Sequence, residues 1–187
     1  MVRRIEKYLL KKIETDRTIH ITLIDPEKVT PAQASSIAAR AKTSETTAIM
    51  VGGSTFSSVT HLDAIVKAIK RTVGIPVILF PGNISGISRH ADAIWFMSLL
   101  NSVDPYFLIG AQILGAPTIK KYRIEPIPLG YIIVGEGGAA GVVGRAVPIP
   151  YDKPELAVAH AWLGNTWVCA LSIWKLALAP KTLFRRR

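Results

Sequence analysis

The sequence predicts an α/β fold built around a parallel sheet, and three observations support this prediction. Short apolar runs alternate with helical segments at the spacing of strand–helix–strand units. The apolar runs are continuous, as expected for strands that are covered on both faces. A carboxylate, Asp25, ends the first run, and a Gly52-Gly53 turn follows the second. Because parallel strands end at the same face of a sheet, these two features predict a ligand site at that face.

The elements follow one another in a regular order along the chain. The N-terminus has the pattern of a short amphipathic helix, with Ile5, Leu9 and Ile13 on one face. This segment is charged throughout and lacks the apolar core of a signal peptide. The remaining segments are predicted strands at roughly 18–25, 47–51, 76–82, 91–101 and 128–134, helices at roughly 31–41, 59–72, 106–121 and 154–163, and a glycine-rich loop at 135–144.

Composition narrows the classes of protein. A chain of 187 residues with 49% hydrophobic residues is long enough for one well-buried domain. The single cysteine, Cys169, excludes an intramolecular disulfide and a cysteine-rich zinc site, and a cytoplasmic location is expected. The net charge is +10, but residues 174–187 hold five positive charges and no acid. No helix has base-reading spacing and no aromatic platform motif is present, so no nucleic-acid partner is expected.

The carboxylate and the glycine turn are the strongest candidates for chemistry. A carboxylate beside a Gly-Gly-hydroxyl turn on one face of a sheet favours Mg²⁺ and phosphate groups as ligands. For Asp25 the alternative is a helix N-cap before Pro26, a position where aspartate is common. For Ser54 the alternative is a simple turn without a ligand.

Five motifs, taken together, resemble a known enzyme family. They read His-Ile-Thr-Leu-Ile-Asp-Pro-Glu-Lys, Val-Gly-Gly-Ser, Phe-Pro-Gly-Asn, Phe-Met-Ser-Leu-Leu-Asn-Ser and Gly-Ala-Gln. In their order and spacing they resemble the geranylgeranylglyceryl phosphate synthases of archaea and the bacterial relatives of these enzymes. The resemblance runs from about residue 5 to about residue 165.

The resemblance implies a fold, an activity and a site. The fold is a (β/α)8 barrel of the TIM type, of which residues 1–165 hold about the first five to six βα units. The activity is Mg²⁺-dependent transfer of a geranylgeranyl group from its diphosphate to the C3 hydroxyl of sn-glycerol 1-phosphate, a step of archaeal ether-lipid biosynthesis. Asp25 and Ser54 match the metal-binding positions of the family, and Gly52 and Gly53 would bring backbone amides to the diphosphate. The family also implies a homo-oligomer and peripheral contact with a membrane.

Other residues near the predicted strand ends receive structural interpretations. His20 is expected to be a hydrogen-bonded core histidine, and Glu136 a solvated loop acid. Trp95 and Phe96 are neighbours on one strand and therefore point to opposite sides of it. Three polar residues at the end of the same strand either shape a prenyl channel or cap the next helix: Ser98, Asn101 and Ser102.

The chain departs from the family at its C-terminal end. The family continues with a Tyr-Leu-Glu-Ala-Gly-(Ser/Thr)-Gly motif and two phosphate-binding turns that hold glycerol phosphate, and residues 166–187 contain none of them. Synonymous codons exist for Trp174 to Arg187 that read Glu-Ala-Gly-Thr-Gly-Ala-Gln-Asn-Pro-Val-Pro-Pro-Glu when translation starts at the third base. We therefore interpret 166–187 as an out-of-frame tail that follows a frameshift near residues 162–171. A barrel cut at this point is expected to fold poorly and to have little or no synthase activity, because its edges and the acceptor site are open.

The sequence leaves two alternative functions open, each from a different class of protein. In the first, residues 156–180 form a membrane anchor, because this segment is long and has few strongly polar residues, and Arg185 to Arg187 follow it. In the second, the chain is a phosphate-binding barrel of different chemistry, such as a sugar-phosphate isomerase. That chemistry needs an acid/base pair at the strand ends, and the sequence offers no convincing one.

The frameshift interpretation predicts the nucleotide sequence from codon 160 past the stop codon. We expect a shifted frame to encode the Glu-Ala-Gly-Thr-Gly motif and then the remaining strand–helix units of a barrel. Sequencing of the gene on both strands tests this directly. A shifted frame without the motif would rule the interpretation out.

Overall fold

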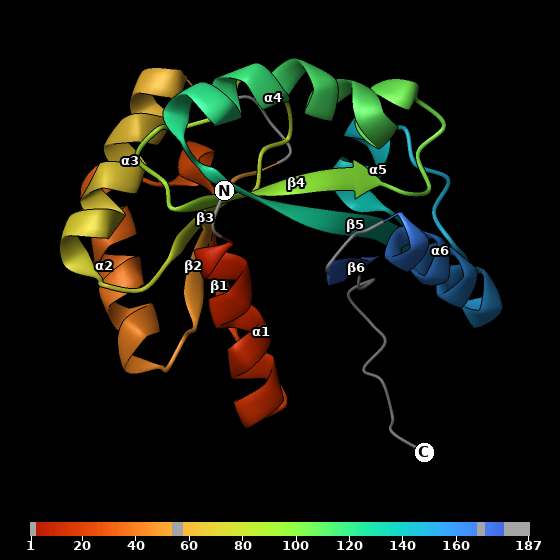
Figure 1. Ribbon diagram of the computed structural model, residues 1–187, viewed down its shortest axis with the longest axis horizontal. Helices are drawn as coiled ribbons and strands as arrows, with labels where there is room; N and C mark the ends of the chain where they lie inside the picture. Colours follow the sequence, from red (N-terminus) through yellow and green to blue (C-terminus); the bar gives the residue numbers. More distant parts are fainter. Residues whose placement is uncertain (1–2, 54–57, 168–170, 178–187) are drawn as a thin grey trace. The chain divides into compact units, whose positions relative to one another are not determined.

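The computed structural model describes residues 3–53, 58–167 and 171–177. The chain forms two compact units, one from Met1–Phe96 with Ile113–Ile127 and the other from Met97–Gln112 with Pro128–Arg187. Figure 1 traces the strands and helices, which alternate along the sequence. The strands follow one another in the order β1-β2-β3-β4-β5-β6, and the pairs β1–β2, β2–β3, β3–β4 and β5–β6 are parallel.

The first unit contains the strands and helices of the N-terminal half. Its strand pairs are β1 with β2, β2 with β3, and β3 with the start of β4. Figure 1 shows α2 and α3 beside one another, and these two helices make the most extensive helix–helix contact of the described residues. The elements are α1 (Arg4–Asp16), β1 (Ile21–Ile24), the 3-10 helix η1 (Pro26–Lys28), α2 (Pro31–Thr43), β2 (Ala48–Val51), α3 (Val59–Thr72), β3 (Val77–Leu79) and, shared with the second unit, β4 (Ala93–Leu99).

Successive side chains of a strand point to opposite faces of the sheet, and this alternation determines which strand residues enter the core of the first unit. Ile49 and Val51 of β2 point to the side where α2 and α3 pack, and so do Val77 and Leu79 of β3. The helices present small or branched apolar residues to the same core: Ala34, Ala38 and Ala41 from α2, and Leu62, Ile65, Val66 and Ile69 from α3. Burial of these side chains, at about 25 cal/mol for each Å² of apolar surface, is the main force that holds the helices on the sheet.

Local sequence signals set the start of α2. Thr30 accepts a hydrogen bond from the Gln33 amide, and the Gln33 side chain accepts one from the Thr30 amide, which together form a capping box. Pro31 occupies the first helical position, where its missing N–H costs nothing. The predicted boundaries of α3 at residues 59 and 72 agree with the structure.

The second unit is built on β5 and β6. β5 is longer than the predicted strand because it begins at Glu125, and β6 pairs with it in parallel from Leu129↔Leu171 to Gly135↔Ala177. The predicted 106–121 helix begins as a π-helix and continues as an α-helix. The elements are η2 (Tyr106–Gly110), α4 (Ala111–Tyr122), β5 (Glu125–Gly135), α5 (Gly138–Val143), α6 (Pro154–Thr166) and β6 (Leu171–Ala177), with α4 and β5 contributing to both units.

Three predictions about local structure need correction. The glycine-rich segment 135–144 is not wholly a loop, because Gly138–Val143 form α5. His20 is exposed and precedes β1, so it is not a core residue; its backbone carbonyl accepts hydrogen bonds from the Thr47 amide and the Thr46 hydroxyl. Residues 156–180 are not one helix, since α6 ends at Thr166 and β6 follows. In the described part of the chain, no helix is long and apolar enough to cross a membrane.

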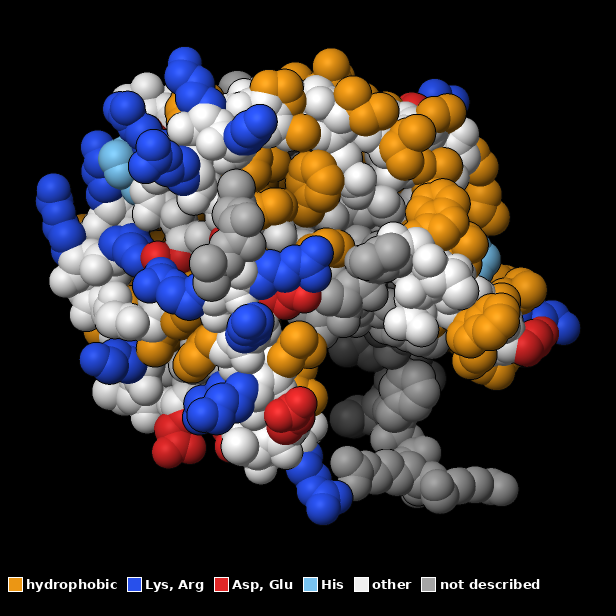
Figure 2. Space-filling model, in the orientation of Figure 1, with side chains coloured by type: hydrophobic (Ala, Val, Ile, Leu, Met, Phe, Trp, Pro, Cys, Tyr) orange, Lys and Arg blue, Asp and Glu red, His pale blue; other side chains and the backbone are white. Residues whose placement is uncertain are grey.

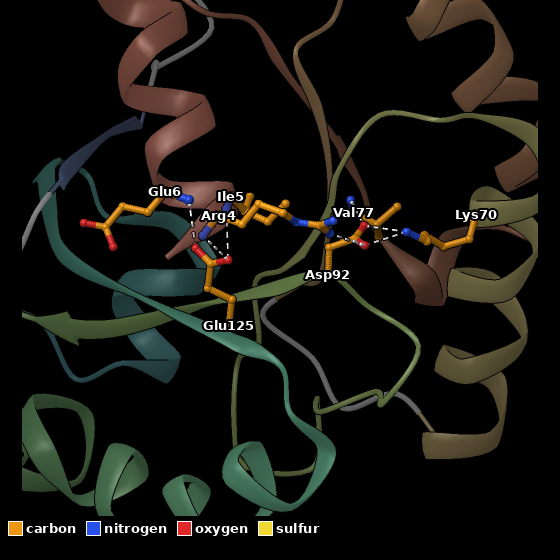
Figure 3. A network of polar contacts seen from close by, with 7 residues as sticks. All are labelled: Arg4, Ile5, Glu6, Lys70, Val77, Asp92 and Glu125. Carbon is orange, nitrogen blue, oxygen red and sulfur yellow. Dashed lines mark hydrogen bonds and ion pairs between the residues drawn. The ribbon is translucent and has the colours of Figure 1, made fainter. Parts of the chain in front are cut away.

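A buried carboxylate at the start of β5, Glu125, attaches α1 to the rest of the first unit. The residue before this helix, Arg3, offers no side-chain cap. Instead, Glu125 accepts hydrogen bonds from the backbone amides of Arg4, Ile5 and Glu6, each at 2.9 Å. Figure 3 shows how this carboxylate faces the first turn of the helix. Glu125 is only 7% exposed, and its negative charge complements the positive end of the helix dipole.

A second carboxylate continues the network beside Glu125. The backbone amide of Glu125 donates to the Asp92 carbonyl. The Asp92 side chain accepts hydrogen bonds from the Lys70 ammonium of α3, at 2.6 and 2.7 Å, and from the Val77 amide at 2.9 Å (Figure 3). Two acids therefore connect the N-terminal helix, α3 and the first residue of β3.

Replacement of Glu125 tests whether this cap stabilises the fold. We expect Glu125→Gln to lower the free energy of unfolding by about 2 kcal/mol, because two buried amide donors and one partly buried donor lose a charged acceptor. Glu14→Gln is the matched control, since Glu14 is an exposed acid on α1, the helix that Glu125 caps. Urea unfolding followed by circular dichroism measures both variants. Equal midpoints for the two variants would contradict the capping role.

Candidate functional site

The register of three parallel strands brings the predicted site residues together. Ile24 of β1 lies opposite Val51 of β2, which lies opposite Leu79 of β3. The pairing continues one residue further, because the Gly52 amide donates to the Ile24 carbonyl at 3.1 Å and the Phe80 amide donates to the Val51 carbonyl at 2.8 Å. The segments that follow these strands therefore start at one level, at the carboxyl edge of the sheet.

Asp25 lies directly against the glycine turn. A Cβ atom added to Gly53 would meet Asp25 Oδ1 at 2.8 Å and Oδ2 at 3.2 Å. The same carboxylate caps η1, since Oδ1 accepts a hydrogen bond from the Glu27 amide at 3.1 Å. Lys28 pairs with Oδ2 at 3.4 Å. The N-cap alternative for Asp25 is thus correct as a description of its local role.

Capping leaves the carboxylate with capacity for a further ligand. An ionised carboxylate has about four lone-pair sites, and the cap uses one of them. The side chain of Asp25 is 23% exposed, while that of its partner Lys28 is 79% exposed. The Asp25 side chain is therefore partly accessible from solvent.

Gly52 allows an unusually close approach between two strand ends. A Cβ atom at Gly52 would lie 1.8 Å from the carbonyl oxygen of Phe80, so no side chain fits there without a shift of the backbone. Gly52 is buried and Gly53 is partly exposed. The narrow turn that results keeps the backbone of residues 52–53 against Asp25.

The donor set is sparse in the described residues. No group of three or more histidine, cysteine, aspartate or glutamate residues that could hold a metal ion occurs in 3–53, 58–167 and 171–177. Such a set does not suit Zn²⁺, which takes three or four protein ligands. It fits Mg²⁺, which binds through one or two carboxylates together with substrate phosphates. Ser54, the second predicted ligand, lies outside the described residues.

A histidine that the sequence analysis did not single out joins the site loop to α3. The Nε2 atom of His61 lies 2.9 Å from the carbonyl oxygen of Pro26, the residue after Asp25. Pro26 is buried and His61 is partly buried. No motif marks His61, because its proximity to Pro26 follows from the packing of η1 against α3.

The polar residues at the end of β4 have structural partners within the second unit. The Ser98 hydroxyl donates to the Leu108 carbonyl and accepts from the Gln112 side chain, both at 2.7 Å. The Asn101 amide nitrogen donates to the carbonyls of Ile133 and Val147, and its oxygen accepts from the Ile133 amide. The Ser102 hydroxyl donates to the Gly144 carbonyl. These contacts hold the surrounding backbone in place, and none of them caps the next helix, η2, which has no side-chain cap.

The remaining candidates agree with their structural interpretations. Trp95 is 2% exposed and its indole N–H donates to the sulfur of Met50, whereas Phe96 packs on the core beneath the helices. The two rings therefore lie on opposite sides of β4, as predicted. Glu136 is exposed.

Burial raises the pKa of Tyr131 on β5 to about 12, so its phenol is protonated at neutral pH and does not serve as a base there.

Comparison with known proteins identifies relatives along most of the chain. The model of the PcrB family matches residues 11–172. A geranylgeranylglyceryl phosphate synthase of Thermofilum pendens is 54% identical over 158 residues, which are 84% of this chain and 62% of the relative. A synthase of the same name from Pyrococcus abyssi is 51% identical over 164 residues, or 88% of this chain and 65% of the relative. The chain thus spans less than two thirds of the length of these curated relatives.

Solved structures agree with these relatives. A crystal structure of (S)-3-O-geranylgeranylglyceryl phosphate synthase from Thermoplasma acidophilum, in complex with its substrate sn-glycerol-1-phosphate, superposes with a TM-score of 0.88. It is 36% identical and covers 94% of this chain and 70% of its own. The wild-type enzyme of Thermoplasma volcanium has the same TM-score, with 38% identity over 91% of this chain and 68% of its own. The predicted fold class, α/β of the TIM-barrel type with part of the barrel present, is confirmed.

Substitution of Gly52 and of Gly53 is expected to lower the free energy of unfolding by different amounts. Gly52→Ala forces its Cβ against a backbone carbonyl and is expected to lower the free energy of unfolding by about 3 kcal/mol. Gly53→Ala brings its Cβ nearest to the movable Asp25 carboxylate and is expected to lower the free energy of unfolding by about 1 kcal/mol or less. Gly74→Ala is the control, because a Cβ there has no neighbour within 4 Å. Urea unfolding measures all three, and a Gly52 variant as stable as the Gly74 variant would disprove the close approach.

Proposed function

The chain belongs to the PcrB family, and we propose that it carries the diphosphate-binding part of a geranylgeranyl transferase. The complete reaction joins the prenyl group of geranylgeranyl diphosphate to the C3 hydroxyl of sn-glycerol 1-phosphate. The single observation that carries the proposal is the closeness of the Asp25 carboxylate to Gly53, where an added Cβ atom would lie 2.8 Å from Oδ1, at the carboxyl edge of registered parallel strands. The names of the relatives supply the substrate class, and the bound substrate of the Thermoplasma acidophilum enzyme supplies the acceptor.

The chemistry of a prenyl diphosphate explains why these groups are needed. As the allylic carbon–oxygen bond breaks, negative charge collects on the departing diphosphate. Mg²⁺, when bound, neutralises part of that charge. Asp25 would hold the ion through the lone pairs that the η1 cap leaves free, and Ser54 would add a hydroxyl oxygen. Gly53 would let its backbone approach the phosphate oxygens, whereas the Gly52 amide is already paired with the Ile24 carbonyl and is not a donor to the diphosphate.

Diphosphate binding and prenyl transfer are separate properties of this chain. The groups proposed for the diphosphate come from β1, β2 and the residues that follow them, and they lie in the first unit. The family motifs expected for the acceptor are absent from residues 166–187. We therefore expect the chain to bind a metal–diphosphate complex more readily than it completes transfer to glycerol phosphate.

The expected partners also include a second subunit and a membrane surface. Figure 2 shows apolar side chains gathered over α6, and the exposed ones there are Leu156, Val158, Trp162 and Leu163. Exposed apolar groups of this kind are usually covered by a partner. They support the prediction of a homo-oligomer, which stays a prediction from the family, as do peripheral membrane contact and a cytoplasmic location.

Removal of the Asp25 charge tests the proposed function. We expect Asp25→Asn to weaken the binding of inorganic pyrophosphate in the presence of Mg²⁺ by about tenfold or more, because the carboxylate beside the glycine turn loses its charge. Titration calorimetry with and without Mg²⁺ measures the effect. Asp152→Asn is the control, since Asp152 is an exposed acid of the second unit. Equal affinities in the two variants would reject Asp25 as a ligand.

A further inference from the structure

We propose that His61 is a positioning residue that holds the Asp25 loop in the geometry required for the metal–diphosphate complex. This inference rests on the proposed function and extends it to a residue outside the family motifs. It concerns the hydrogen bond between the imidazole ring of His61 and the backbone carbonyl of Pro26, at 2.9 Å. His61 acts through the loop and does not touch substrate.

The direction of this hydrogen bond is determined by its partner. A backbone carbonyl only accepts, so Nε2 of His61 must carry the hydrogen. Pro26 is buried, and an unpaired buried carbonyl costs about 1–3 kcal/mol. The histidine thus satisfies a group that would otherwise oppose closure of η1 onto α3.

Among the described residues, the other hydrogen bonds of residues 25–28 lie within the loop itself. The Lys28 amide donates to the Asp25 carbonyl at 3.1 Å, and the Glu27 amide donates to Asp25 Oδ1 at the same distance. These two bonds shape the 3-10 turn but do not orient it relative to the sheet. The bond from His61 connects the turn to a separate element, the first turn of α3.

α3 is a suitable support because it is fixed to the core. Leu62, the next residue, is 2% exposed, and Ile65, Val66 and Ile69 are fully buried. The helix also continues the segment that begins with Gly52 and Gly53. One side chain therefore connects the loop that carries the carboxylate with the helix that follows the glycine turn. A shift of either element would alter the contact between Asp25 and Gly53.

Groups that do not touch the metal but fix the orientation of one of its ligands have measurable effects on metal affinity. Loss of such a group typically weakens metal binding by about 10–100-fold. We expect the lower end of this range for His61, because Asp25 keeps both of its internal contacts with η1 when the imidazole is removed.

The test compares two substitutions with a matched control. His61→Leu removes the donor but keeps the apolar volume, and His61→Gln keeps an N–H donor at similar reach. His160→Leu is the control, because His160 also places a ring nitrogen near a backbone carbonyl, at 2.7 Å, but within its own helix α6. Two properties are measured on the full chain: hydrogen exchange of the Glu27 and Lys28 amides without ligand, and the affinity for Mn²⁺ with inorganic pyrophosphate by electron paramagnetic resonance.

The expected pattern is specific to a positioning role. In His61→Leu the two amides exchange about fivefold faster and Mn²⁺–pyrophosphate affinity falls about tenfold. His61→Gln restores both properties towards wild type, and His160→Leu changes neither. The amides of Ile65 and Val66 keep their wild-type exchange in every variant, which separates loop release from unfolding of α3.

The measurements distinguish failure of the positioning role of His61 from failure of the proposed function. If wild type binds Mn²⁺ and pyrophosphate and His61→Leu binds them equally well, with unchanged amide exchange, His61 has no positioning role and the proposed function stands. If wild type binds neither, the proposed function fails, and the positioning role fails with it, whatever the amides show. A loss of affinity that His61→Gln does not restore would also overturn the inference.

Discussion

The register of β1, β2 and β3 is the constraint on which the site depends. A shift of one residue in a strand exchanges the two faces of its side chains. Here such a shift would turn Ile49 and Val51 away from the helices, so burial of the core holds the register in place. The same register sets Asp25, Gly52 and Phe80 at one level beyond the strand ends. The level at which the three strands end is therefore a consequence of core packing, whereas the orientation of the Asp25 loop depends on hydrogen bonds of its own.

Much of this arrangement was accessible from the sequence because its signals are local. Apolar runs, Pro31 and the glycine turn predict strands, a helix start and the edge of the sheet, and α3 was placed with its observed boundaries. The failures involve tertiary context. His20 belongs to an apolar stretch but precedes the strand and is exposed, and the glycines at 138 and 141 sit within a short helix despite their low helix propensity.

Contacts between distant segments were beyond prediction from one sequence. Glu125 reads as an ordinary acid before an apolar strand, yet it caps a helix that starts more than a hundred residues earlier. His61 reads as a polar residue at the start of an amphipathic helix, and only the packing of η1 on α3 reveals its partner. Periodicity records which face of an element is buried, but it contains no information about which backbone group a buried polar atom meets.

The local role of Asp25 and its proposed role as a ligand are compatible because they use different parts of the carboxylate. The cap occupies one lone pair of Oδ1, and the Lys28 ammonium lies 3.4 Å from Oδ2. An ion pair with so exposed a lysine contributes about 0–1 kcal/mol at most, since water screens it. A divalent ion that arrives with a diphosphate would therefore displace the lysine at small cost. The cap meanwhile keeps the carboxylate from rotating, so the loop offers the ligand a pre-oriented oxygen.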